Sequence, residues 1–115
     1  MEKWIDVGAV DSIAEGLTFI RQKELRCVLY KTGDGLHAFS ALCPHLGGPM
    51  DRAECDGMVV SCPLHGWQFD LNAGGTEING YKPLRMFDIA QADGRLLVRQ
   101  VLPAFVLAEK SPKAT

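Results

Sequence analysis

The chain has 115 residues, of which 47% are hydrophobic and 23% charged, with a formal net charge of −2. This length is typical of a single domain with one modest core, which leaves no room for a separate catalytic domain. Because the charge is slightly negative and no basic block is present, we expect no nucleic acid partner.

The acidic residues are concentrated in the middle of the chain. Residues 41–80 contain five acidic residues against the single Arg52, a net charge of −4, and the remainder carries +2. An acidic region of this kind would steer a basic partner protein. Ordinary solvated loop charges explain the same pattern equally well.

The sequence offers no export signal or membrane anchor. Residues 1–6 are charged where a signal peptide needs an apolar run. The longest largely apolar stretch, residues 101–108, contains Pro103 and is too short to span a bilayer. We therefore expect a cytoplasmic protein without membrane contact, whose four cysteines are metal ligands and buried thiols rather than disulfides.

Short strand patterns follow one another along the chain and are separated by turn residues. The predicted strands are residues 4–7, 17–20, 26–30, 36–40, 57–61, 67–70, 84–89 and 95–98. Residues 11–16 are predicted to form a polar turn with space for one helical turn, and residues 32–35 and 92–94 supply the hairpin turns. The fold class is therefore all-β, a small antiparallel β barrel or sandwich.

The C-terminal tail, residues 101–115, is more apolar than a chain end usually is. Pro103 can open a short helix with Leu102, Phe105 and Val106 on one side. Packing of this tail against its own barrel and docking to another subunit both remain open. Residues 111–115 are expected to be frayed.

Two short arms carry the metal-binding chemistry. Cys43 and His45 have the spacing C-x-H, and Cys62 and His65 have C-x2-H, with sixteen residues between the two arms. Both arms are flanked by proline and glycine. Mixed Cys/His arms suit a two-iron, two-sulfide cluster, if each arm gives its thiolate to one iron and its imidazole to the other.

Two other interpretations fit these arms less well. A structural zinc site also uses two cysteines and two histidines, but zinc modules usually pair like with like or use C-x2-4-C knuckles. A redox disulfide between Cys43 and Cys62 leaves both histidines without a role. Of the other candidates, Cys27 is predicted to be a buried thiol, Cys55 a partly exposed free thiol and His37 a surface histidine.

The arms and the residues that follow them resemble the Rieske family. The resemblance rests on Cys43-Pro44-His45 and Cys62-Pro63-Leu64-His65, and continues through residues 66–70. It implies a Rieske-type [2Fe–2S] cluster, one per chain, with Cys43 and Cys62 on the buried iron and His45 and His65 on the outer iron. It also implies a single Rieske domain over residues 1–100, with a two-loop cluster-binding subdomain at about residues 41–80.

The resemblance also implies a shell around the cluster. Leu46, Gly47, Pro49 and Pro63 match a cover that brings backbone N–H groups to the sulfides, although ordinary turn residues would look the same. Trp67 would shield the cluster, unless it is a core tryptophan. Pro83 matches the proline that a third loop places across the cluster.

Residues that are missing indicate the branch of the family. High-potential members carry two further cysteines and a serine and a tyrosine whose hydroxyls face the cluster. The matching positions here are Gly48, Leu64, Trp67 and Phe69. Since fewer hydrogen bonds then stabilise the reduced state, we predict a potential near the bottom of the Rieske range of roughly −150 to +300 mV.

The function that this resemblance implies is electron transport rather than catalysis. The chain would be a soluble, monomeric ferredoxin that takes single electrons from a ferredoxin reductase to the terminal oxygenase of a ring-hydroxylating dioxygenase or aromatic monooxygenase system. His45 and His65 would face solvent as the electron exit. An alternative is the small Rieske-like subunit of an assimilatory nitrite reductase. An enzyme in its own right would need a mononuclear iron site, and only His37 remains for one.

Overall fold

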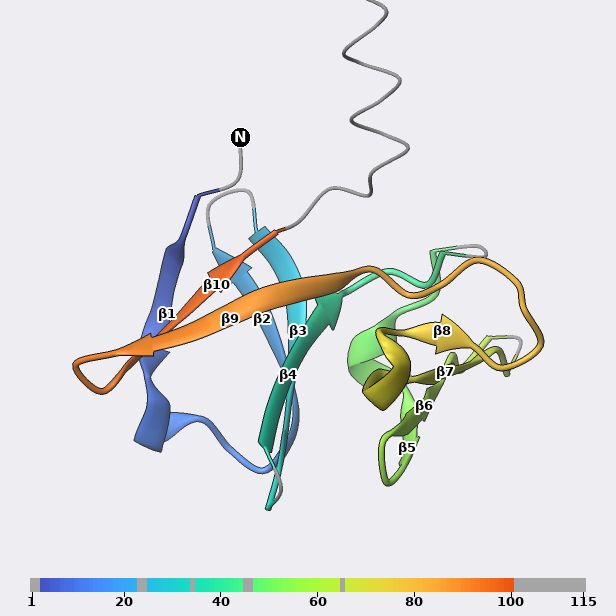
Figure 1. The fold of residues 1–115 in the computed structure, drawn as a ribbon, viewed down its shortest axis with the longest axis horizontal. Helices are drawn as coiled ribbons and strands as arrows, with labels where there is room; N and C mark the ends of the chain where they lie inside the picture. Colours follow the sequence, from blue (N-terminus) through green and yellow to red (C-terminus); the bar gives the residue numbers. More distant parts are fainter. Residues whose placement is uncertain (1–2, 23–24, 34, 45–46, 65, 101–115) are drawn as a thin grey trace, which may run out of the picture.

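The computed structural model describes residues 3–22, 25–33, 35–44, 47–64 and 66–100. These residues form two antiparallel β-sheets and three short 3-10 helices, and no α-helix is found among them. The two sheets form two lobes that lie beside each other (Figure 1). The predicted all-β fold class is therefore confirmed.

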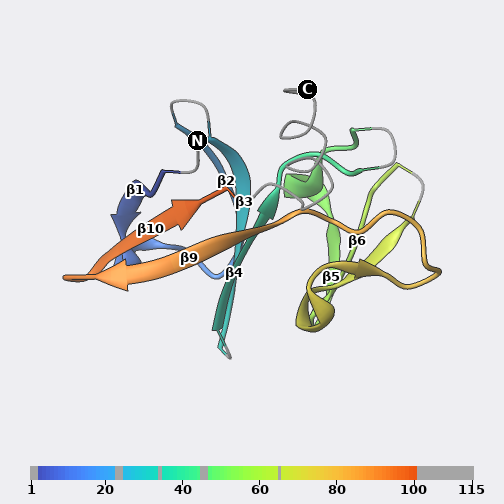
Figure 2. The same cartoon turned by 45° about the horizontal axis from the view of Figure 1, so that its top comes forward.

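The larger sheet is a nearly closed antiparallel barrel. Its strands are β1 (Ile5–Ala9), β2 (Gly16–Gln22), β3 (Leu25–Thr32), β4 (Gly35–Ser40), β9 (Met86–Ala92) and β10 (Arg95–Arg99), in the order β1-β10-β9-β4-β3-β2. The Gln22 Nε2 donates a hydrogen bond of 2.7 Å to the Asp6 carbonyl oxygen, which links the two edge strands β2 and β1. Figure 2 shows β9 running from the smaller lobe into this barrel.

Strand β3 is apolar on both faces because each face covers a different core. Successive strand residues point to opposite faces, so a strand buried on both sides is a nearly continuous apolar run. The barrel core contains Ile13, Leu25, Cys27, Leu29, Ala38, Phe87, Leu96 and Val98. The second core contains Val28, Tyr30, Phe39, Ala41, Cys43, Met50, Val60, Cys62, Phe69, Leu71 and Leu84. Strands β3 and β4 are therefore the wall that separates the two cores.

The smaller sheet packs on the outer side of that wall. Its strands are β5 (Glu54–Asp56), β6 (Val59–Ser61), β7 (Gln68–Asp70) and β8 (Thr76–Glu77), in the order β5-β6-β7-β8. The 3-10 helices are η1 (Val10–Ser12), η2 (Met50–Arg52) and η3 (Leu71–Ala73). The Tyr30 hydroxyl of β3 donates a hydrogen bond of 2.8 Å to the Gly57 carbonyl oxygen, which ties the smaller sheet to the barrel.

The strands predicted from the sequence are all present, with shifted ends. The sequence pattern missed β5 and β8, because strands of three and two residues are too short to show an apolar period, and all three residues of β5 are exposed. Cys27 is buried and Cys55 is an exposed free thiol, as predicted. His37 is partly buried and lies opposite Tyr30 across β3 and β4.

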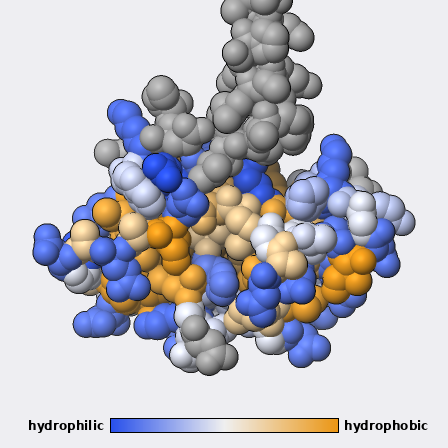
Figure 3. All heavy atoms as spheres, viewed as in Figure 1, coloured by the Kyte–Doolittle hydropathy of each residue, from blue (hydrophilic) through white to orange (hydrophobic). Residues whose placement is uncertain are grey.

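Several large apolar side chains are exposed. In Figure 3 apolar surface lies over both lobes and is bordered by hydrophilic residues. The exposed large hydrophobic residues are Trp4, Phe19, Leu42, Leu64, Ile78 and Tyr81. In the part of the chain that the structure describes, no helix has the length and apolar character needed to cross a membrane. The helix predicted to open at Pro103 lies outside the described residues.

Candidate metal centre

The first predicted ligand, Cys43, begins a tight turn that ends at Gly48. The Cys43 N–H donates a hydrogen bond of 2.9 Å to the Gly48 carbonyl oxygen, and the Gly47 N–H donates one of 2.9 Å to the Cys43 carbonyl oxygen. Gly47 has φ +74°, a left-handed conformation that favours glycine because it lacks Cβ. We call residues 43–48 the first turn.

The second predicted cysteine, Cys62, begins a turn with the same backbone hydrogen bonds. The Cys62 N–H donates a hydrogen bond of 2.8 Å to the Trp67 carbonyl oxygen, and the Gly66 N–H donates one of 2.9 Å to the Cys62 carbonyl oxygen. Gly66 has φ +73°. We call residues 62–67 the second turn. Each turn therefore repeats the other: a Cys-Pro start, a left-handed glycine four residues on, and two bonds to the cysteine backbone.

The two turns bring their cysteines into the same core. Cys43 and Cys62 are each 3% exposed and both belong to the second core. A Cβ added to Gly48 would lie 2.6 Å from the Cys62 Sγ, so the second cysteine packs directly against the first turn. Two buried cysteine thiols from facing turns are a donor set that fits a soft metal centre.

The predicted histidine ligands follow their cysteines by two and three positions in the sequence. His45 and His65, together with Leu46, lie outside the described residues, so the structure does not place them. In the described part of the chain, no three or more His, Cys, Asp or Glu side chains gather closely enough to hold a metal ion. The four-ligand set therefore remains a prediction, supported by the placement of its two cysteines.

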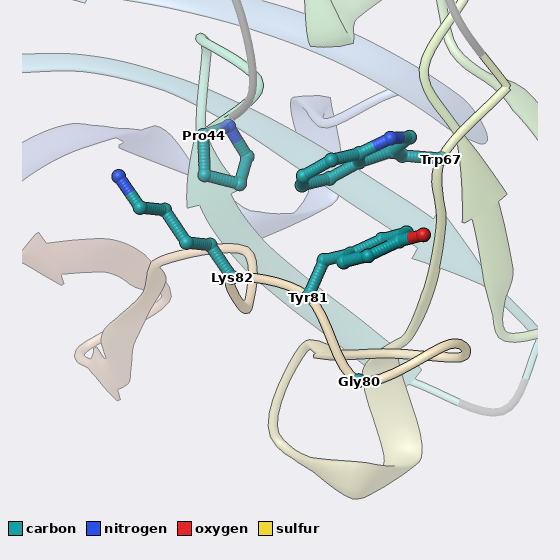
Figure 4. Close-up of a pocket in the computed structure, with 5 residues that line it drawn as sticks. All are labelled: Pro44, Trp67, Gly80, Tyr81 and Lys82. Carbon is teal, nitrogen blue, oxygen red and sulfur yellow. The ribbon is translucent and has the colours of Figure 1, made fainter.

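A third loop, residues 78–83, lies beside the two turns and completes a small cavity. The cavity has a volume of about 350 Å³ and is lined by Pro44, Trp67, Gly80, Tyr81 and Lys82. The rings of Trp67 and Tyr81 are stacked, with centroids 4.7 Å apart and planes 21° apart. Figure 4 shows the indole lying over the tyrosine ring, with the Pro44 ring and the Lys82 side chain opposite. The first turn, the second turn and the third loop thus each contribute residues to the lining of the cavity.

Glu77 accepts hydrogen bonds from the backbone of the third loop. It is 1% exposed, and its Oε1 accepts hydrogen bonds of 2.7 Å from the Asn79 N–H and 3.1 Å from the Tyr81 N–H. The Gly80 N–H donates a further bond of 2.9 Å to the Glu77 carbonyl oxygen. These three bonds fold residues 78–81 tightly over the end of β8.

The structure describes most of the remaining predicted site residues, which lie on the two turns and the third loop. Trp67 is partly buried against the second core and also stacks on Tyr81, and its role as a shield of the cluster stays a prediction. Gly47 and Pro63 are exposed on their turns, and Pro83 is exposed on the third loop. Pro83 is not among the residues that line the cavity, whereas its neighbours Tyr81 and Lys82 are. The predicted proline cover therefore stays a prediction.

Sequence reasoning did not find Glu77 or Tyr81. Both lie within a few residues of Pro83, where the pattern gave a weak turn and no strand. The available signal was an acidic residue next to Ile78 and an aromatic residue in a loop of glycine, asparagine and lysine. Neither residue type at these positions indicates a role without knowledge of the fold.

The positions that lack the high-potential features also lie at this site. Gly48 faces Leu64, whose Cγ and Cδ1 would each be 3.3 Å from an added Cβ. Phe69, at the predicted tyrosine position, is fully buried, with its ring centroid 6.5 Å from that of Trp67. Phenylalanine and tryptophan rings cannot donate an O–H to a sulfur.

Comparison with known proteins defines the class of this site. The model of the Rieske [2Fe-2S] domain matches residues 3–88. The match covers most of the chain and includes both turns and the third loop. The chain therefore belongs to the Rieske family, and its cofactor is a [2Fe–2S] cluster.

The relatives are of two kinds. The chain is 31% identical over 97 residues to the ferredoxin subunit of methanesulfonate monooxygenase from Methylosulfonomonas methylovora, an alignment that covers 77% of this chain and 73% of the relative. It is 37% identical over 68 residues to cytidine monophosphate-N-acetylneuraminic acid hydroxylase from Xenopus laevis, where 56% of this chain covers only 12% of the relative. The chain thus spans most of a small ferredoxin subunit and a small part of a large hydroxylase.

Solved structures agree with the fold. The ferredoxin of carbazole 1,9a-dioxygenase from Nocardioides aromaticivorans IC177 is 25% identical, with a TM-score of 0.70 and coverage of 83% of this chain and 95% of that chain. A structure titled as a nitrite reductase small subunit from Mycobacterium tuberculosis has a TM-score of 0.72 at 20% identity, with coverage of 90% and 99%. The second likeness, at this identity, shows the fold alone.

Proposed function

We propose that the chain is a soluble, cytoplasmic and monomeric Rieske ferredoxin of low potential. It carries single electrons from a ferredoxin reductase to the terminal oxygenase of an aromatic-hydrocarbon hydroxylating system. The observation that carries this proposal is the pair of repeated Cys-Pro turns with both thiols in one core. The match to a ferredoxin subunit, which covers 73% of that subunit's length, supports the proposal.

The cluster would be held by four side chains from the two turns: Cys43, His45, Cys62 and His65. When bound, a cluster of this kind stores and releases one electron at a time. The chain supplies the holding frame, because the two hydrogen bonds at each cysteine backbone fix the direction in which the thiolate points. Burial of both thiols in the second core keeps water away from the cysteine side of the site.

A low potential follows from what surrounds the thiols. Phe69 and Trp67 offer no hydroxyl, and hydrogen bonds to cluster sulfurs raise the potential by stabilising the more negative reduced state. Gly48 and Leu64, which face each other, cannot form the disulfide that links the arms of high-potential proteins. The midpoint potential is therefore expected near roughly −150 mV, the bottom of the Rieske range.

The partner is best described as an oxygenase of the Rieske systems. A structural neighbour, 23% identical with a TM-score of 0.74, comes from a complex of oxygenase and ferredoxin in carbazole 1,9a-dioxygenase. The apolar side chains of Leu42, Leu64 and Tyr81 are exposed on the segments that surround the site. A small apolar surface of this kind suits a brief contact between electron-transfer proteins.

The nitrite reductase alternative rests on a likeness of fold at 20% identity. Gene neighbourhood separates the two functions: oxygenase subunits beside the gene support the ferredoxin, and a sirohaem enzyme supports the alternative.

The decisive experiment measures iron, acid-labile sulfide and the electron paramagnetic resonance spectrum of the dithionite-reduced protein. We expect two irons and two sulfides per chain, a spectrum with the low average g value of mixed Cys/His ligation, and loss of that spectrum in Cys62→Ser and His65→Ala. One iron per chain, or a zinc content that replaces iron, would overturn the proposal. A strongly positive midpoint in a redox titration would overturn its low-potential part.

A further inference from the structure

Glu77 is an unusual residue in this fold. Among the described residues it is the one polar or charged side chain that is buried, at 1% exposure. Its Oε1 accepts two backbone N–H groups, whereas its Oε2 is buried and has no hydrogen-bond partner in the part of the chain that the structure describes. A buried carboxylate oxygen without a partner carries a desolvation cost.

Because of that cost, space-filling alone does not explain a glutamate at this position. A side chain that only filled the space under β8 would be better as leucine, which has a similar volume and no oxygen to desolvate. The two accepted hydrogen bonds are therefore the property that distinguishes glutamate here. Both come from the third loop, at Asn79 and Tyr81.

The third loop connects Glu77 to the second turn through a short chain of contacts. The Oε1 bond fixes the Tyr81 backbone, and the Tyr81 ring stacks on Trp67 with centroids 4.7 Å apart. The Trp67 carbonyl oxygen accepts the Cys62 N–H at 2.8 Å. Each step is a direct contact. The Ile78 N–H also donates a hydrogen bond of 2.9 Å to the Gln68 carbonyl oxygen, but neither Glu77 nor Tyr81 takes part in that bond, so a change at either residue reaches the second turn through the aromatic stack.

We propose that Glu77 is a positioning residue of the metal centre. Its carboxylate holds the third loop so that the Tyr81 ring stacks on Trp67, and this stack holds the turn that carries Cys62 in place. The inference rests on the proposed function in one respect, since it takes Cys62 as a cluster ligand. Glu77 itself touches neither the cysteine nor the cluster.

We expect the third loop to open in Glu77→Leu without unfolding of the rest of the protein. Asn79 and Tyr81 are exposed, so their N–H groups can bond to water once Oε1 is removed. In Glu77→Leu the loss of two hydrogen bonds is offset by the loss of a buried, unpartnered oxygen. We therefore expect global stability close to that of the wild type together with an open loop, a combination that a purely structural glutamate would not give.

Amide hydrogen exchange tests the loop directly. In Glu77→Leu, exchange at Asn79 and Tyr81 should be faster by about tenfold, since a hydrogen bond to a charged group is lost at each. Glu77→Gln keeps the Oε1 acceptor and should stay within about threefold of the wild type. Glu54→Gln, the same acid-to-amide change on exposed β5, is the control. Unchanged protection in Glu77→Leu, or equal loss in Glu77→Gln, would overturn the proposal.

Cluster release to an iron chelator tests the step from loop to metal centre. Glu77→Leu and Tyr81→Ala should each speed release by about tenfold, and the double variant should be no faster than either, because both changes break one chain of contacts. Independent, multiplicative effects would contradict this chain, as would release at the wild-type rate in both single variants. If the wild type binds no cluster, the proposed function fails, and the exchange experiment still decides the role of Glu77.

Discussion

The two sheets of this protein are stabilised in different ways. The barrel has strands of five to eight residues and a core of aliphatic side chains together with Phe87 and one buried cysteine. The smaller sheet has strands of two or three residues, and its core contains Cys43 and Cys62 and is completed by β3 and β4 of the barrel. The barrel thus has a hydrophobic core formed mainly by its own strands. The smaller sheet depends on β3 and β4 of the barrel and on the group that its two thiols bind.

Removal of the cluster should produce the largest difference between the two sheets. Metal binding is coupled to folding when the ligands are brought together only in the folded state. In protein stripped of iron, we expect backbone amides of β6 and β7 to lose most of their protection, while those of β3 keep theirs. Hydrogen exchange with and without a chelator measures this. Equal loss in both sheets would show that the barrel also depends on the cluster.

Gly48→Ala should break the metal centre and leave the barrel intact. The added Cβ would lie 2.6 Å from the Cys62 Sγ, closer than real Cβ contacts, so the thiol or the first turn must move. We expect at least about tenfold less iron per chain, since ligand geometry in a metal site tolerates little displacement. Iron content and visible absorbance measure it.

Gly33→Ala is the matched control for that variant. Gly33 lies in the barrel hairpin with no atom within 4 Å of an added Cβ. It should bind iron as the wild type does. Normal iron content in Gly48→Ala would mean that the two turns do not face each other as the structure shows.

The difference between the sheets also explains what the sequence could predict. The run Cys27-Val28-Leu29-Tyr30 alternates between two cores, and its apolar character on both faces was enough to predict a strand. The two Cys-Pro turns were predictable because Cys, Pro and Gly at fixed spacing have few other uses. In both cases the local sequence alone carries the information.

The third loop could not be predicted in the same way. The role of Glu77 depends on β8 pairing with β7, and the role of Tyr81 depends on a tryptophan fourteen positions earlier in the chain. Strands as short as β5 and β8 form because the neighbouring strand is already in place, not because of their own pattern. Features that arise from tertiary pairing leave no apolar periodicity in the sequence.

High pH should destabilise the barrel through ionisation of the Cys27 thiol. Burial raises the pKa of this thiol to about 12, from an ordinary value of 9.0. Between pH 9 and 12 the unfolded chain releases the proton and the folded chain keeps it, so the free energy of unfolding falls as the pH rises, by about 1.4 kcal/mol per pH unit. Urea unfolding of iron-free protein from pH 8 to 11 measures the slope.

Cys27→Ala isolates that contribution. Burial also raises the pKa values of Tyr30 and Cys55, and these two groups contribute the same slope to both proteins. The stability of Cys27→Ala should therefore decline less steeply above pH 9, while the two proteins keep a constant difference below it. Parallel curves across the whole range would mean that the thiol is not desolvated in the barrel core.

Tyr30→Phe should give the smallest effect and should act on the contact between the two sheets. The Tyr30 hydroxyl donates to the Gly57 carbonyl oxygen at 2.8 Å, and its ring stays in the second core in either variant. Loss of one hydrogen bond of this kind costs about 1 kcal/mol. Because the bond joins the turn between β5 and β6 to the barrel, exchange should rise in those strands and stay unchanged in β9 and β10. Tyr81→Phe, which removes an exposed hydroxyl and keeps the stacked ring, should change neither.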